Sequence, residues 1–129
     1  MSQLKITNLN KSFGETRVLK DINLEINSGE FIVFVGPSGC GKSTLLRCIA
    51  GLESLSSGNL EIDGIQMKDV PASERGIAMV FQTYALYPHM SVSENMQYSL
   101  KIAKMPKKER QALVQWVAKT LHLDDYLDR

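Results

Sequence analysis

Nine consecutive residues, Gly36–Thr44, combine three glycines, a lysine and hydroxyl side chains in the order GPSGCGKST. The spacing of Gly36 and Gly41 from the lysine–serine pair that follows is that of a phosphate-binding loop (P-loop). Average residue usage would produce this pattern by chance only about 0.004 times in a chain of this length. The segment is therefore predicted to bind phosphate groups.

Each residue type in this segment has a physical reason. Gly36, Gly39 and Gly41 permit backbone angles and close approaches that a Cβ atom would block, so successive N–H groups can converge on one phosphate. A helix that follows the loop would direct its unpaired N-terminal donors at the same anion. Lys42 would add a mobile cation for the outer phosphates, and the Ser43 hydroxyl would suit the coordination shell of Mg²⁺.

The apolar pattern around the loop predicts the elements that position it. Phe31–Val35 is a continuous apolar run, typical of a strand covered on both faces in a parallel sheet. After the loop, apolar residues recur at helical spacing, and Gly51 is placed to end that helix. A second run, Ile77–Phe81, predicts another buried strand of the same kind.

The remaining stretches predict an antiparallel portion and a helical one. Residues 4–9 and 18–26 alternate polar with apolar residues, and Asp63-Gly64 is a strong signal for a hairpin turn. Ser91–Glu94 has the form of a capping box that opens a helix, and Pro106 starts another. This order indicates an α/β protein with an antiparallel N-terminal β-subdomain.

Length and composition exclude several classes of protein. The chain has 129 residues, enough for one domain or part of one, and 43% hydrophobic against 22% charged residues excludes wholesale disorder. A net charge of +1 disfavours a nucleic-acid binder. The apolar runs are too short to span a bilayer, and no secretory signal is visible. Two cysteines without metal-ligand spacing favour a reduced, cytosolic compartment.

Two longer segments, GPSGCGKSTLLRCIAGLE and ERGIAMVFQTYALYPHMSVSEN, resemble the ATP-binding subunits of ABC transporters. Within that family they are most similar to the ATPases of carbohydrate importers of the maltose, glycerol-3-phosphate and multiple-sugar type. The resemblance covers essentially the whole chain and implies a P-loop NTPase core that is incomplete at the C-terminus. Residues 1–129 would then be the N-terminal part of one nucleotide-binding domain, with the β-subdomain and core up to about residue 90 and a helical segment from about residue 91.

The resemblance also implies ATP and Mg²⁺ as ligands and adds two site residues. Phe13 occupies the position of an aromatic ring that stacks on adenine, although a lone aromatic at a strand end is more often core packing. Gln82 follows the second apolar run and matches a glutamine that reaches magnesium and the hydrolytic water, the alternative being a solvated loop residue. Lys42 and Gln82 would be catalytic, and Ser43 and Gln82 would bind the metal. The nucleotide-binding residues would be Phe13, Gly36, Pro37, Ser38, Gly39, Cys40, Gly41, Lys42, Ser43 and Thr44.

Hydrolysis in this family requires parts that the sequence does not contain. They are a later strand ending in Asp-Glu, a switch histidine and a glycine-rich signature segment from a second subunit. We therefore expect the chain alone to be inactive as an ATPase. The resemblance implies that the complete protein has a second ATP-binding subunit and transmembrane permease subunits as partners, and that it binds no nucleic acid. It also implies a peripheral position at the cytoplasmic face of the plasma membrane, where contact with the membrane is indirect.

Two interpretations of function stay open at this point. In the first, the chain is the ATP-binding part of an importer ATPase that powers uptake of a solute, a sugar or sugar phosphate. In the second, it is a truncated or decayed P-loop fragment without transport activity. A small-molecule kinase is a weaker alternative, because the stretch between the loop and the second apolar run is rich in hairpins and no arginine-rich lid follows.

Overall fold

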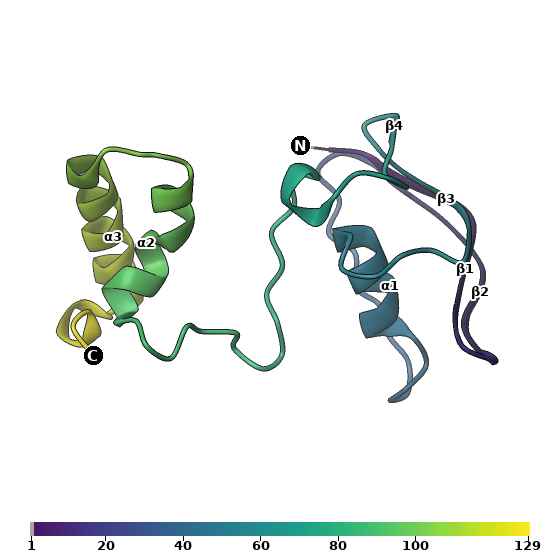
Figure 1. The fold of residues 1–129 in the computed structure, drawn as a ribbon, viewed down its shortest axis with the longest axis horizontal. Helices are drawn as coiled ribbons and strands as arrows, with labels where there is room; N and C mark the ends of the chain where they lie inside the picture. Colours follow the sequence, from purple (N-terminus) through teal and green to yellow (C-terminus); the bar gives the residue numbers. More distant parts are fainter. Residues whose placement is uncertain (1) are drawn as a thin grey trace. The chain divides into compact units, whose positions relative to one another are not determined.

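The computed structural model describes residues 2–129 and contains two compact units, divided between Met79 and Val80 (Figure 1). The first unit holds a sheet, one α-helix and a short 3₁₀ helix; the second holds two α-helices and a short 3₁₀ helix. In chain order the elements are β1 (Leu4–Phe13), β2 (Thr16–Ile26), α1 (Lys42–Ala50), β3 (Ser57–Ile62), β4 (Ile65–Gln66), η1 (Ala72–Glu74), α2 (Val92–Ile102), α3 (Lys107–Leu121) and η2 (Asp124–Tyr126).

The sheet of the first unit has the strand order β2-β1-β3-β4, and its described pairs are all antiparallel. The hairpin from β1 to β2 closes at the pair Phe13 and Thr16. The predicted turn between β3 and β4 forms at Asp63 and Gly64, which have φ angles of 52° and 75°. Positive φ at both central residues is what a type I′ hairpin turn needs, so the Asp-Gly signal correctly predicted this antiparallel portion.

Helix α1 packs on this sheet and ends where the sequence predicts. Leu45 and Cys48 of the helix share a core with residues of the sheet, of which Leu9 and Leu60 are almost completely buried. Gly51 takes a left-handed φ of 78° and its N–H donates to the carbonyl oxygen of Cys48. This left-handed C-cap is the conformation that glycine adopts most readily.

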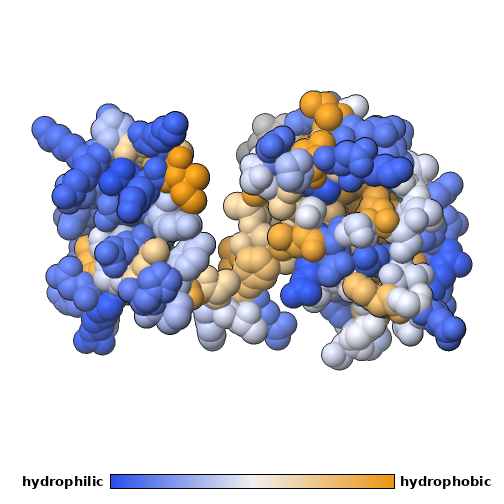
Figure 2. Space-filling model, in the orientation of Figure 1, coloured by the Kyte–Doolittle hydropathy of each residue, from blue (hydrophilic) through white to orange (hydrophobic). Residues whose placement is uncertain are grey.

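The two apolar runs expected to form a parallel sheet are not strands in the structure. Phe31 and Val35 are each 91% exposed, and Val80 is 96% exposed. A strand exists only with a hydrogen-bonding neighbour, and within residues 2–129 neither run has one. Figure 2 shows orange, hydrophobic side chains at the surface of the unit that holds the sheet.

The second unit is a pair of antiparallel helices, α2 and α3, and the residues of η2 and after it pack against them. Ser91 caps α2, with its hydroxyl accepting from the N–H of Glu94 and the Glu94 carboxylate accepting from the N–H of Ser91, so the predicted capping box is confirmed. The small core contains Val114, Ala118 and Leu127. Of the helices in the described part of the chain, none is both long and apolar enough to cross a membrane.

Candidate functional site

Residues 36–44 form a loop that leads directly into α1, and two of its glycines lie where a Cβ atom would crowd a neighbouring side chain. Gly41 has a φ of 100°, and a Cβ atom there would lie 2.8 Å from Leu19 Cδ2 of the sheet. A Cβ atom on Gly36 would lie 2.8 Å from Cys40 Sγ. The glycines therefore allow the loop to fold tightly against β2 and against itself.

The start of α1 is suited to an anion. Across residues 2–129, no side chain caps this helix, and its first turn contains no acidic residue. Leu45 is the first residue whose N–H donates within the helix, to the Gly41 carbonyl oxygen at 2.8 Å. The preceding N–H groups and the positive end of the helix dipole therefore remain available to an anion at the loop.

Lys42 places its ammonium group over the loop. Its Nζ atom donates to the carbonyl oxygens of Gly36 and Pro37 at 2.7 Å each and lies 3.5 Å from Cys40 Sγ. Carbonyl oxygens are neutral acceptors, so phosphate oxygens would be stronger partners for the same ammonium. The lysine is thus already held beside the N–H groups that would bind the anion.

The residues after Lys42 provide the oxygen ligand that magnesium prefers. Ser43 is exposed and Thr44 half-buried in the first turn of α1. Among the residues that the structure describes, no group of three or more His, Cys, Asp or Glu side chains could hold a metal ion. A magnesium ion here would be bound by the Ser43 hydroxyl together with phosphate and water oxygens, a ligand set that Mg²⁺ commonly uses.

Phe13 and Gln82 lie in different units. Phe13 ends β1; the residue is 47% exposed, and the Lys11 Nζ atom lies 4.7 Å from its ring centroid. Gln82 lies in an exposed turn of the second unit. The structure therefore brings the predicted loop residues together in the first unit, while the role of Gln82 stays a prediction.

Arg75 joins η1 to the C-terminal end of α1, a role that the sequence alone does not predict. Its guanidinium group donates to main-chain carbonyl oxygens from two segments, at distances of 2.7 to 3.0 Å. No local pattern indicates this role, because the acceptors on α1 lie more than 25 residues earlier in the chain. Those acceptors are the carbonyls of Cys48 and Ile49 on α1 and of Met67 and Val70 before η1.

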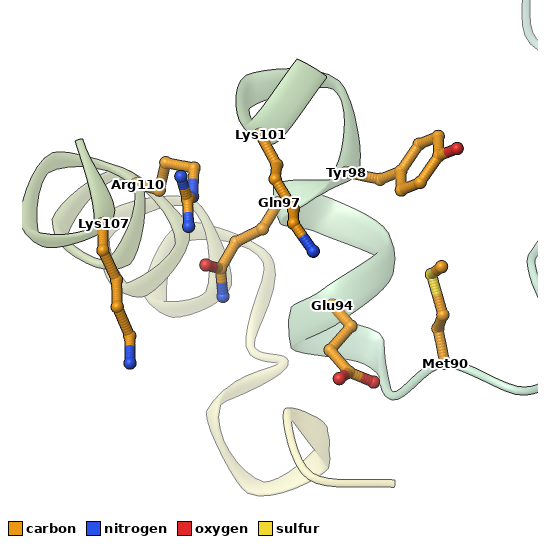
Figure 3. Close-up of a pocket in the computed structure, with 7 residues that line it drawn as sticks. All are labelled: Met90, Glu94, Gln97, Tyr98, Lys101, Lys107 and Arg110. Carbon is orange, nitrogen blue, oxygen red and sulfur yellow. The ribbon is translucent and has the colours of Figure 1, made fainter. Parts of the chain in front are cut away.

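A separate pocket of about 410 Å³ lies between the helices of the second unit. Figure 3 shows Gln97 and Lys101 projecting from α2, and Lys107 and Arg110 from the start of α3. Its lining residues are Met90, Glu94, Gln97, Tyr98, Lys101, Lys107 and Arg110. None of the predicted nucleotide or metal residues is among them, so this pocket is distinct from the P-loop site.

The loop, its lysine and the uncapped helix define a class of protein, the P-loop nucleotide-binding proteins. The chain belongs to the ABC transporter family, which it matches over residues 19–129. It is 60% identical over all 129 residues to the lactose transport ATP-binding protein LacK of Rhizobium radiobacter, covering 36% of that protein. It is 57% identical to the maltose/maltodextrin import ATP-binding protein MalK of Klebsiella aerogenes, covering 44% of it.

A solved structure agrees with the fold. The chain matches the ATP-binding cassette MJ0796, in a dimeric post-hydrolysis state bound to ADP and Pi, with a TM-score of 0.84 and 33% identity. The match covers 98% of this chain and 60% of that one. The resemblance to sugar-importer ATPases and the ABC-type fold class are therefore confirmed, and the chain spans less than half the length of the LacK and MalK relatives.

Proposed function

We propose that this chain supplies the ATP-binding part of an ABC importer ATPase that powers uptake of a sugar or sugar phosphate. The observation that carries the ATP-binding part is the Lys42 ammonium group, held over the loop carbonyls beside the uncapped start of α1. The sugar class is supported by the similarity to proteins named for lactose transport and maltose import.

In this proposal each site residue has a defined role toward the nucleotide. Main-chain N–H groups of the loop and of the first turn of α1 bind the phosphate chain, and Lys42 neutralises its outer phosphates. Phe13 stacks on the adenine ring. Ser43 and Gln82 would hold Mg²⁺, which when bound would offset charge on the phosphates, and in the complete protein Gln82 would also orient the hydrolytic water.

The complete protein would act with partners. Its second ATP-binding subunit would form a dimer with the first, and permease subunits would carry the solute through the membrane, which places the ATPase peripherally at the cytoplasmic face. Phosphoryl transfer needs groups that orient water and stabilise the transition state, beyond those that bind phosphate. We therefore propose that this chain by itself binds magnesium-ATP without turning it over.

The decisive test is the affinity for magnesium-ATP of three forms of the chain, measured by isothermal titration calorimetry. Lys42→Ala should weaken binding at least tenfold, since a charge-assisted contact to phosphate is lost. Lys20→Ala, which removes one positive charge from an exposed position on β2, should bind like the unchanged chain. Equal affinity of the Lys42→Ala variant and the unchanged chain would contradict the assignment, and Lys42-dependent phosphate release would contradict the proposed inactivity.

A further inference from the structure

Lys11 is buried despite its charge. The residue is 6% exposed, and its Nζ atom lies 3.1 Å from a carboxylate oxygen of Glu53. Lysine is almost never fully buried unless it is paired, because removing an ammonium group from water is costly. The ion pair with Glu53 offsets that cost and fixes where the ammonium group lies.

The same ammonium group contacts the ring of Phe13. The Nζ atom is 4.7 Å from the ring centroid, within the range of a cation–π interaction. Lys11 and Phe13 are two residues apart on β1, so the strand projects both side chains to the same face of the sheet. Phe13 nevertheless stays 47% exposed, so it retains surface on which a planar ligand could stack.

The end of β1 is also tied to the segment that follows α1. The Ser56 N–H donates to the Asn10 carbonyl oxygen, and the Ser12 N–H donates to the Ser56 hydroxyl, both at 2.9 Å. The ion pair between Lys11 and Glu53 is the third link between these two segments. Because α1 begins at the P-loop, these links set the position of the Phe13 ring relative to the helix that carries the phosphate site.

We propose that Lys11 is a positioning residue for the nucleobase. Held by Glu53, it fixes the plane of the Phe13 ring so that the ring accepts a purine base whose phosphates lie on the loop before α1. Lys11 does not touch the phosphates. This inference rests on the proposed function, because it requires that the first unit bind a purine nucleotide.

The experiment compares two ligands, magnesium-ATP and inorganic tripolyphosphate, which share the phosphates and differ in the nucleoside. Affinities are measured by calorimetry for the unchanged chain, Lys11→Met, Lys11→Arg and Phe13→Ala. Lys11→Met should weaken ATP binding about threefold to tenfold, the range of a partly buried cation–π contact. Tripolyphosphate affinity should stay within about twofold, and Lys11→Arg, which keeps a cation over the ring, should restore ATP binding.

Two further variants separate positioning from folding. Lys11→Met/Glu53→Gln removes both charges, so that no carboxylate is left unpaired, and should reproduce the loss of ATP affinity seen for Lys11→Met. Lys5→Met changes an exposed lysine on the same strand and should alter the affinity for neither ligand. Far-UV circular dichroism of every variant should match that of the unchanged chain.

Each alternative outcome overturns the inference in a distinguishable way. Equal loss of ATP and tripolyphosphate affinity would show that Lys11 supports the structure of the unit and does not position the nucleobase. If both variants that carry Lys11→Met bound ATP normally while Phe13→Ala lost ATP affinity, Lys11 would have no role in binding the base. The proposed function would then still stand. If the unchanged chain bound neither ligand, the proposed function would fail and the inference with it.

Discussion

Arg75→Met should destabilise the first unit by about 2–4 kcal/mol. A hydrogen bond to a charged group contributes roughly 1.5–3 kcal/mol, and the Arg75 guanidinium makes four of them. The four do not add fully, because they share one donor group that is only half-buried. The expected loss is still a large fraction of the 5–15 kcal/mol that is typical for a domain.

Urea unfolding followed by far-UV circular dichroism measures this loss as a change in the free energy of unfolding. Arg75→Lys should lose most of the same stability, because lysine keeps the charge but cannot form the planar fork. Arg47→Met is the matched control: it removes a positive charge from the last turn of α1 and should cost at most about 1 kcal/mol. A change below about 0.5 kcal/mol for Arg75→Met would refute the assignment of a stabilising role to these bonds.

Two other predictions concern acid stability and thiol reactivity. Hydrogen bonds from the Ser2 hydroxyl and the Gln3 N–H hold the pKa of Asp63 below its ordinary value of 3.8, so the stability it contributes is present above that pH and is lost as the pH falls through the folded-state pKa. Asp63→Asn should therefore lower the melting temperature more at pH 7 than at pH 2, and an equal effect at both would contradict this. Burial raises the pKa of the Cys48 thiol, which is 1% exposed, whereas Cys40 is exposed. A colorimetric disulfide reagent at pH 8 should titrate one thiol rapidly and the second only in urea; a single fast phase from two thiols would count against the packing of α1.

The parts of the fold that the sequence predicts well are those determined by neighbouring residues. The turn at Asp63-Gly64 and the capping box at Ser91–Glu94 each need only a few adjacent side chains, and both are present. The runs Phe31–Val35 and Ile77–Phe81 have strand composition, but pairing depends on a partner elsewhere, and among residues 2–129 neither run has one. Their apolar composition predicts strands that are buried on both faces. It does not indicate which segment would pair with them.

The candidate site also has a part that neighbouring residues determine and a part that depends on contacts between distant segments. The P-loop could be predicted because its chemistry lies in nine consecutive residues, Gly36–Thr44. The contact of Lys11 with Glu53 joins β1 to the segment after α1, and Arg75 reaches back to the end of that helix. These contacts arise only when distant segments fold together, so no spacing in the sequence indicates them.

The exposed apolar runs bear on how the chain behaves at high concentration. Phe31 and Val35, each 91% exposed, belong to a segment with high β-propensity and no charge inside it, a composition that favours strand-to-strand self-association. Glu30 and Pro37 flank this segment closely, and a charge or a proline at such positions acts as a gatekeeper against β-aggregation. Colloidal stability of the chain in solution therefore depends on these two flanking residues as well as on its folded core.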